Sequence, residues 1–280
     1  MRTPKVQLPY RYIKGSAEYR KLKSRAISEN IFYELLKLYK NKDDVAVSEI
    51  GRNYNKLMPA KIDLTVKKLS KAEEENCGAM MSNVIDKNGN TNRFRISIPA
   101  EENEFAIEDL PALIHETVHL FDGLCSPKTT KTISKIYAKN LENITNDFYN
   151  KYFYCGDSTQ IKKVQLPKLK HLTKNFLKKN QKEDRILVLK YMKESLESER
   201  SAFKIQNDCD DYLEKIGRGD RPYTFEEIDM AYHFDEKINM LKKMIFEEIF
   251  KERFNIAQKK AKTPMDKLKL VLDYCFKSIM

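Results

Sequence analysis

Two periodicities divide the chain, a helical one toward both ends and a strand-like one between residues 62 and 98. The first predicted helix covers residues 16–40 and is followed by the polar break NKDD. Its apolar side chains fall near one helical face: Leu22, Ile27, Ile31, Leu35 and Leu38. Residues 45–58 predict a second, shorter helix that is interrupted around Gly51.

The strand-like region predicts a small sheet. In KIDLTVKKL, apolar and polar residues alternate from Ile62 to Lys67, which is typical of a half-buried strand. GAMMSNVI and RFRISI predict two further strands, and the Asn88-Gly89 pair between them is a strong β-hairpin signal. The last strand ends at Pro99 and has two faces, with Phe94, Ile96 and Ile98 on one and Arg93, Arg95 and Ser97 on the other.

Directly after this sheet, EDLPALIHETVHLFD predicts a helix over residues 108–122. Asp109 suits the N-cap, and Pro111 falls in the first turn, where its missing N–H does no harm. Gly123 suits the C-terminal cap. This helix is therefore entered from a β-hairpin.

Everything after Pro127 has helical periodicity. The predicted helices cover residues 128–152, 168–180, 183–207 and 224–258, the last as one helix or two. The whole pattern predicts an α+β protein that is mostly helical. It divides into an N-terminal helical arm (1–44), a small sheet with one helix (45–126) and a helical subdomain (127–280), which together form one domain.

Composition narrows the class of protein. Hydrophobic residues make up 41% of the 280 residues and only 8 are glycine, which favours a folded, helical chain. The five cysteines are scattered without a C-x-x-C pair, which argues against a disulfide framework and against a cysteine zinc site. No apolar run is long enough for a signal peptide or a membrane span, so the sequence predicts a cytoplasmic protein with no membrane segment.

The net charge of +11 raises the question of an anionic partner. The densest basic segment covers residues 162–182 and also contains His171. Its lysines are Lys162, Lys163, Lys168, Lys170, Lys174, Lys178, Lys179 and Lys182. Two interpretations of this segment stay open, a solvated helical face or a surface for weak, non-specific binding of nucleic acid.

The stretch HETVH, in the helix predicted over residues 108–122, carries the clearest chemistry. Residues four apart project from one face of a helix, so His115 and His119 can offer two imidazole nitrogens to one metal ion. Glu116 flanks the pair, in the position to take a proton from a water that the metal makes acidic.

Coincidence is the alternative to a metal site. With four histidines in 280 residues, a chance H-E-x-x-H match is rare. Two uncompensated histidines in a buried helix would each carry a desolvation cost. The residues that make this helix largely apolar are Leu113, Ile114, Val118, Leu120 and Phe121. The pattern therefore favours a metal site.

This motif and its setting resemble the zincin metallopeptidases. The resemblance covers HETVH, the strand-to-helix order before it and a candidate third ligand, about half of the chain. It implies a zincin-like fold, a Zn²⁺ cofactor and a protein or peptide substrate. In that fold the strand at the sheet edge before the active-site helix commonly pairs with an extended substrate. The matching segment here is RFRISIP, which makes Arg95 and Ser97 the expected substrate-binding residues.

The residues after the second histidine indicate the branch of this family. The metzincin extension would need glycine three residues later and histidine or aspartate three residues after that, but this chain has Asp122 and Cys125. The sequence is more similar to the gluzincins, whose third ligand is a glutamate on a later helix. Asp122 would then either orient an imidazole or lie in solvent. Gluzincins often keep an oxyanion-stabilising group downstream of the ligand helix, where this chain has Tyr223, Tyr232 and His233.

Helical phase selects Glu199 as the third ligand from three candidates. A buried stripe is defined by Leu189, Met192, Leu196 and Phe203. Continuing it by three residues from Leu196 places the carboxylate of Glu199 at a core position, where a metal ion would compensate its charge. Glu197 falls in phase with lysines on a solvated face, and Glu194 lies between the two. An ion pair with a lysine or arginine at the edge of the core is the alternative for Glu199.

The leading interpretation is a zinc-dependent peptidase with Glu116 as general base and with His115, His119 and Glu199 as metal ligands. A first alternative keeps the metal without proteolysis, as a zincin-like domain with a structural role in a phage or mobile-element assembly, which would make the protein virion-associated. A second alternative is a basic nucleic-acid-binding protein with a structural metal.

Overall fold

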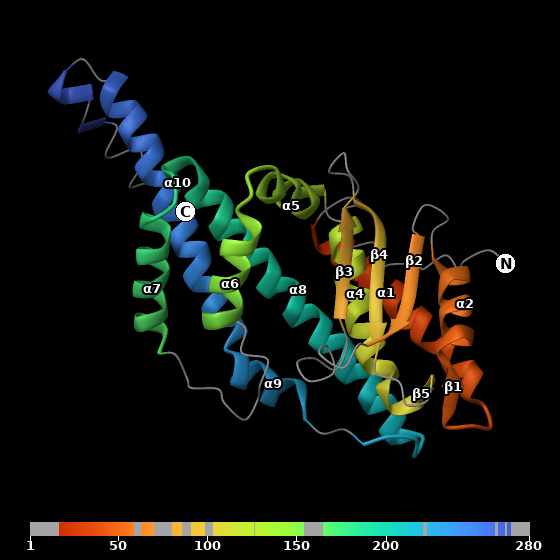
Figure 1. The fold of residues 1–280 in the computed structure, drawn as a ribbon. Coiled ribbons are helices and arrows are strands. Elements are labelled where there is room, and N and C mark those ends of the chain that lie inside the picture. The colour runs from red at the N-terminus through yellow and green to blue at the C-terminus, as the bar shows by residue number, and fades with distance from the viewer. Residues whose placement is uncertain are drawn as a thin grey trace.

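A long helix, α8 (Lys182–Lys215), runs through the molecule and joins a half that contains β-structure to a half made of helices (Figure 1). The computed structural model describes residues 17–58, 63–69, 80–85, 91–98, 103–125, 127–153, 165–220, 223–260, 263–266 and 268–269. The protein is α+β and mostly helical, as the sequence predicts. No helix in these ranges contains a stretch long and apolar enough to cross a membrane.

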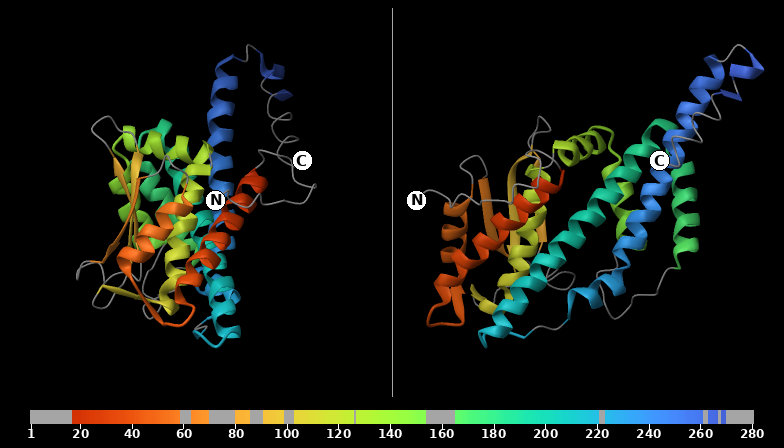
Figure 2. Two further views of the ribbon diagram at one scale, coloured as in Figure 1. Left: turned by 90° about the vertical axis from the view of Figure 1, so that its right-hand side faces the viewer. Right: turned by 180° about the vertical axis from the view of Figure 1, so that it is seen from behind.

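The first half combines helices with two small sheets. Its elements are α1 (Ala17–Leu36), a 3-10 turn (Lys37–Tyr39), β1 (Asp44–Ala46), α2 (Val47–Leu57), β2 (Asp63–Lys68), β3 (Met80–Ile85), β4 (Thr91–Ile98), β5 (Glu104–Ala106), a second 3-10 turn (Ile107–Asp109) and α4 (Leu110–Cys125). The second half contains α5 (Pro127–Ala138), α6 (Glu142–Tyr152), α7 (Leu166–Lys178), α9 (Phe225–Tyr232) and α10 (Phe234–Lys260). Figure 2 shows α4 packed behind the larger sheet, with α1 and α8 on the other side of α4.

The larger sheet has the strand order β2-β4-β3. β3 and β4 pair antiparallel, so the hairpin predicted for these two strands is confirmed, while its Asn88-Gly89 turn lies outside the described residues. β2 pairs with the other side of β4 in parallel, with Asp63 opposite Arg93. A second, two-stranded sheet pairs β1 with β5 antiparallel.

β4 is the central strand of this sheet, so the expectation that RFRISIP forms a sheet edge is wrong. Both of its sides are hydrogen-bonded to neighbouring strands, and no backbone edge is left for an extended peptide. Arg95, which is exposed, and Ser97, which is buried, therefore cannot bind a substrate by strand pairing along β4. The alternating pattern identified the faces of this strand but carried no information about its neighbours.

Two hydrophobic cores lie on either side of the middle of α8. The first core is formed mainly by α1, α2, α4 and the C-terminal part of α8, from Ala202 to Leu213. The second is formed by α5, α6, α7, α10 and the N-terminal part of α8, from Val188 to Leu196. These cores divide the chain differently from the three predicted segments, because α1 packs into the sheet-containing core and α8 contributes to both.

Two residues with a left-handed backbone separate helices, one within the single helix predicted over residues 128–152 and one within residues 224–258, which are predicted as one helix or two. Residues 128–152 form α5 and α6, because Asn140 takes φ +52° between them. His233 takes φ +51° and separates α9 from α10. Asparagine and histidine adopt this conformation more readily than most residues, but neither does so often enough to predict a break by itself.

Glycines at the other predicted boundaries do not interrupt their helices. α2 continues through Gly51, and α4 continues through Gly123 to Cys125. The prediction that Gly123 caps the helix carrying HETVH is therefore wrong. α4 does begin directly after Asp109 with Pro111 in its first turn, as predicted. α8 also runs beyond the predicted end at residue 207, because its C-terminal part packs into the first core.

A buried hydrogen bond fastens α2 to the middle of α4. The hydroxyl of Thr117 donates to the carbonyl oxygen of Leu113 one turn earlier, at 2.7 Å. The hydroxyl of Tyr54 lies 2.5 Å from the same Thr117 oxygen and must be the donor, since the threonine proton is already used. Burial raises the pKa of the Tyr54 phenol above its usual range, so this donor keeps its proton.

Replacing Tyr54 with phenylalanine should lower the free energy of unfolding by about 1 kcal/mol, the typical net contribution of a buried hydrogen bond. The ring still fills its place in the core, so the loss measures the hydroxyl alone. Urea unfolding followed by circular dichroism measures the change. Tyr33→Phe is the control, because the Tyr33 side chain on α1 is 47% exposed. Equal stability of the two variants would contradict a buried Tyr54–Thr117 bond.

Candidate metal centre

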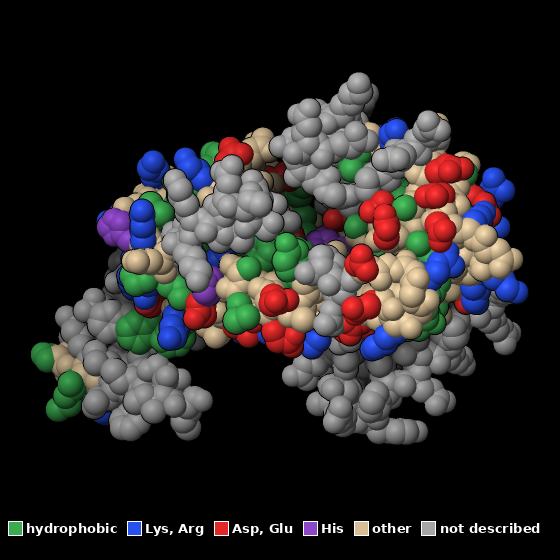
Figure 3. Space-filling model, turned by 90° about the horizontal axis from the view of Figure 1, so that it is seen from below, with side chains coloured by type: hydrophobic (Ala, Val, Ile, Leu, Met, Phe, Trp, Pro, Cys, Tyr) green, Lys and Arg blue, Asp and Glu red, His purple; other side chains and the backbone are tan. Residues whose placement is uncertain are grey.

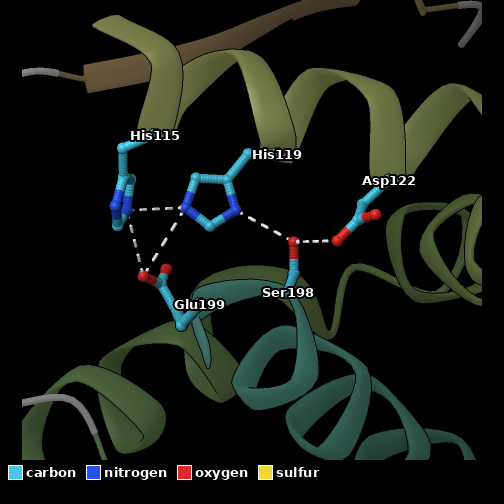
Figure 4. A network of polar contacts seen from close by, with 5 residues as sticks. All are labelled: His115, His119, Asp122, Ser198 and Glu199. Atoms are coloured by element: carbon cyan, nitrogen blue, oxygen red, sulfur yellow. Dashed lines mark hydrogen bonds and ion pairs between the residues drawn. The ribbon is translucent and has the colours of Figure 1, made fainter. Parts of the chain in front are cut away.

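α4 presents the HETVH stretch between the first core and α8. Ile114, Thr117 and Val118 are fully buried on the core side of this helix. His115 and His119 come from the side that faces α8, where Figure 4 shows their rings converging on Glu199. The helical spacing of four predicted the shared face of the two histidines, and the structure brings the predicted third residue to it.

Three side-chain atoms form a small triangle at this point. The Nε2 atoms of His115 and His119 lie 3.1 Å apart. One carboxylate oxygen of Glu199, Oε2, lies 3.5 Å from each of these nitrogens. Two imidazole nitrogens this close repel one another through their lone pairs unless a proton or a cation lies between them.

The dimensions of this triangle fit a tetrahedral metal ion. Ligand atoms about 2.0–2.1 Å from a tetrahedral zinc lie about 3.3–3.4 Å from one another. The three separations bracket that value. Oε2 of Glu199 is also buried and has no hydrogen-bond partner among the described residues, which is unusual for a carboxylate oxygen. The donors present therefore fit a metal ion held by two imidazoles and one carboxylate.

Glu116 lies beside this triangle without closing it. Its carboxylate comes within 4.8 Å of the ligand atoms of both histidines. Its side chain is nearly buried, with the whole residue 9% exposed. This position matches the sequence prediction of a group that flanks the metal and can accept a proton from water held there.

Charge complementarity within the triangle shifts two pKa values in opposite directions. Burial alone would lower the pKa of His119, but the negative charge of Glu199, with help from Glu116 and Asp122, raises it to about 9. Burial alone would raise the pKa of Glu199, but the positive charge of His119 and polar contacts with both imidazoles hold it below the usual range. Without a metal, the two residues therefore form a buried imidazolium–carboxylate pair.

The second ring nitrogen of His119 is also held. Its Nδ1 atom lies 2.9 Å from the hydroxyl oxygen of Ser198, the residue before Glu199 on α8. The Ser198 hydroxyl in turn donates to Oδ2 of Asp122 at 3.0 Å (Figure 4). Asp122 thus lies next to the site, and it reaches the imidazole through a serine rather than directly.

His115 is held by packing. Its ring meets the ring of Phe203 edge-on, with the centroids 4.6 Å apart. Its Nδ1 atom is buried and has no hydrogen-bond partner in the described part of the chain. Phe203 lies one helical turn beyond Glu199 on α8, so the same helix positions both histidines, by a hydrogen bond to one and an aromatic contact to the other.

The three candidates for an oxyanion-stabilising group differ in their places. The ring of Tyr232 packs on Phe203, with the centroids 5.2 Å apart. The side chain of Tyr223 is largely exposed. His233 pairs through Nδ1 with Glu236 at 3.0 Å. Of the three, only Tyr232 has a ring that packs on Phe203, the residue whose ring contacts His115.

Glu197 and Glu194, the other two glutamates considered as the third ligand, make other contacts. Glu197 forms an ion pair with Lys193 at 2.7 Å, one turn earlier on the same helix, and both side chains are partly buried instead of lying on a solvated face. Glu194 is partly buried, and burial raises the pKa of its carboxyl group. Helical phase therefore identified the glutamate that reaches the histidines.

The helix that carries the histidines and the segment before it are acidic, although the chain as a whole is basic. Residues 103–125 contain Glu104, Glu108, Asp109, Glu116 and Asp122 and no lysine or arginine. Figure 3 shows Asp and Glu side chains gathered near the middle of one face and over the half that contains the sheets. This sign of charge favours a cation at the site and opposes a polyanion there.

The basic segment lies elsewhere. Its described lysines belong to α7 or flank it, and Figure 1 places this helix far from the larger sheet. Lys170 and Lys174 approach the same carboxylate, Glu247 on α10, at 3.4 and 3.8 Å. Lys162 and Lys163 lie outside the described residues. Weak nucleic-acid binding by this segment stays a prediction.

Two residues of the site were missed by sequence reasoning. Ser198 was not considered, and Phe203 was assigned only to the buried stripe of its helix. A serine beside a glutamate carries no local signal of hydrogen bonding to an imidazole 79 residues away in sequence. Only the docking of α8 against α4 reveals this contact.

Binding of zinc should displace a proton from His119. Because its pKa is raised to about 9, the metal-free protein holds this proton at neutral pH. Apparent zinc affinity, measured by competition with a chelator of known protonation, should therefore rise about tenfold per pH unit between about pH 7 and pH 8 and level off above about pH 9. A histidine titration of the metal-free protein by NMR is the control. Affinity that stays flat between these pH values would contradict the charged pair.

Compared with protein-family models, with curated proteins and with solved structures, the chain matches none of them. The assignment of a metal centre therefore rests on the geometry of His115, His119 and Glu199.

Proposed function

We propose that this protein is a zinc-dependent metallopeptidase of zincin-like architecture, most similar to the gluzincin branch. The observation that carries the proposal is the triangle formed by His115, His119 and the buried, otherwise unpartnered carboxylate oxygen of Glu199. Two imidazoles and a carboxylate are the donor set of several catalytic zinc sites, which keep a fourth position open. The order of elements, a hairpin, then the HETVH helix, then a later helix with the third ligand, also supports it.

Each residue of the site has a part in this chemistry. When bound, zinc supplies a Lewis acid that makes water acidic near neutral pH. Glu116 accepts the proton of the attacking water and can pass it to the leaving amine. Its nearly buried position keeps bulk water from competing for that proton. His115, His119 and Glu199 hold the reaction centre on two rigid helices, and the acidic surroundings raise the local concentration of the cation.

The substrate would lie along β3 instead of β4. β3 is an outer strand of the larger sheet, with no partner on its far side among the described strands. It is also the outer strand that packs against α4, whereas β2 packs against α2. An extended peptide added to that side would run next to the helix that carries the histidines. This replaces the substrate-binding role first assigned to Arg95 and Ser97.

Glu116→Gln should separate catalysis from metal binding. The substitution keeps the side-chain volume but removes the proton acceptor, so we expect one zinc per chain and peptidase activity lower by a factor on the order of 10² or more. Zinc content by mass spectrometry and cleavage of casein or a peptide library measure the two effects. Glu108→Gln is the control, because Glu108 is exposed just before α4.

Full activity in Glu116→Gln would contradict the proposed mechanism. Zinc binding by the wild-type protein without cleavage of any peptide would instead favour a zincin-like domain with a structural role. In that case the metal site would stand and the peptidase assignment would not.

Comparison of Glu199→Ala with Glu197→Ala tests the third ligand. The two residues lie two positions apart on α8, but only Glu199 reaches the histidines. We expect Glu199→Ala to lose zinc and activity and Glu197→Ala to keep both, since Glu197 pairs with Lys193 on its own helix and not with the histidines. Glu199→Gln, which keeps the volume, shows whether a loss comes from the charge or from the packing. The opposite pattern, with the metal lost in Glu197→Ala, would disprove the assignment.

A further inference from the structure

The imidazole of His119 is held on both sides by consecutive residues of α8. Its Nε2 faces Glu199 at 3.5 Å, and its Nδ1 faces the Ser198 hydroxyl at 2.9 Å. Successive residues of a helix point about 100° apart, so Ser198 and Glu199 can reach opposite edges of one ring. Figure 4 shows the ring of His119 between the two side chains.

The direction of the hydrogen bonds follows from the proton count. The hydroxyl of Ser198 has one proton, which it donates to Oδ2 of Asp122 at 3.0 Å. Its oxygen is therefore left as an acceptor toward His119. Nδ1 of His119 must be the donor, because two acceptors would repel one another at 2.9 Å. The chain of donors thus runs from His119 through Ser198 to Asp122.

We propose that Ser198 and Asp122 are positioning residues that fix the protonation and the orientation of His119 for metal binding. With the proton held on Nδ1, the lone pair of a neutral His119 is on Nε2, the atom that faces His115 and Glu199. The other tautomer would direct an N–H at the metal position. This inference rests on the proposed metal site and adds to it two residues that do not touch the metal.

The two histidines depend on different interactions for their orientation. His119 is held by the hydrogen bonds that run through Ser198 to Asp122, which we call the relay. His115 is oriented by its edge-on contact with Phe203 and by the ring of His119. Loss of the relay should therefore act on one ligand and leave the other in place. Groups that orient a metal-bound histidine typically contribute 10- to 100-fold to metal affinity. That is the range expected for Ser198.

The test compares zinc affinity in full-length variants by chelator competition. Ser198→Ala should weaken zinc binding about 10-fold or more, because Nδ1–H of His119 loses its acceptor. Ser198→Thr keeps the hydroxyl and should restore affinity close to that of the wild type. Ser195→Ala is the matched control, since Ser195 lies one turn earlier on α8 and donates only to the carbonyl oxygen of Tyr191 in the same helix.

Asp122→Asn separates a relay from two independent contacts. The amide oxygen can still accept from Ser198 but lacks the negative charge, so the expected loss of zinc affinity is smaller than in Ser198→Ala. In the double variant the loss should be close to that of Ser198→Ala alone, because the hydrogen-bonded contact between Asp122 and His119 runs through the serine. Additive losses would overturn the relay and favour a separate effect of the Asp122 charge.

A spectroscopic readout distinguishes positioning from a general loss of packing. The chain has four histidines, so nitrogen–proton correlation spectra of the zinc-loaded protein are simple to assign. His119 should have a proton on Nδ1 that exchanges slowly with water in the wild type and in Ser195→Ala, and faster in Ser198→Ala. Assignment of that proton to Nε2 would overturn the inference, whatever the affinities are.

The outcomes for the relay and for the metal site can be told apart. A wild-type protein that binds no zinc would overturn the proposed function, and the relay with it. Zinc binding by the wild type that is unchanged in Ser198→Ala would overturn the relay alone. Thermal unfolding of each variant shows that it is folded. If Ser198→Ala does not fold, the exchange rate of the Nδ1 proton in Asp122→Asn decides instead, and a rate equal to that of the wild type would overturn the proposal.

Discussion

Burial of charge where α4 crosses α8 is the constraint on which this structure depends. His115, His119 and Glu199 meet there with little access to solvent, and an uncompensated buried ion costs several kcal/mol. Either a proton or a cation has to lie among the three side chains. Because α4 carries the two histidines and α8 carries Glu199, this compensation adds to the packing between these two helices. Occupation of the site and stability of the fold are therefore linked.

Three consecutive residues of α8 connect this helix to α4 on one side and to α9 and α10 on the other. Ser198 contacts Asp122 on α4, and Glu199 faces the histidines. Arg200 pairs with Asp229 on α9 at 3.3 Å and with Asp235 at the start of α10 at 2.8 Å. A helix can do this because successive side chains point in different directions. A shift of α8 at this point would move Glu199, the support of His119 and the attachment of α9 together.

The acidic segment that carries the histidines and the basic segment on α7 lie in different halves of the molecule. The chain has a net charge of +11, yet the segment that leads into the site and forms α4 contains acidic residues and no basic ones. The lysines of α7 lie on the other half of the molecule, and two of them share one carboxylate. Net charge by itself would have suggested a polyanion as the partner. The local sign of charge at the histidines favours a cation over a polyanion at that point.

Much of the site could be predicted from the sequence, because it depends on local spacing. A spacing of four puts His115 and His119 on one helical face whatever the rest of the fold, and the phase of the apolar stripe on α8 singled out Glu199.

The strand order could not be predicted in this way. Alternation shows which residues share a face, but the pairing of β2 with β4 joins segments that are distant in sequence, and it placed Arg95 and Ser97 on a central strand. The same holds for Ser198, whose contact with His119 exists only because two helices cross at one particular position along their lengths.

The sequence by itself determined which chemical groups are present and which face of each helix they occupy. The tertiary structure decided which faces meet, since that depends on how two separate hydrophobic cores pack along the one helix they share.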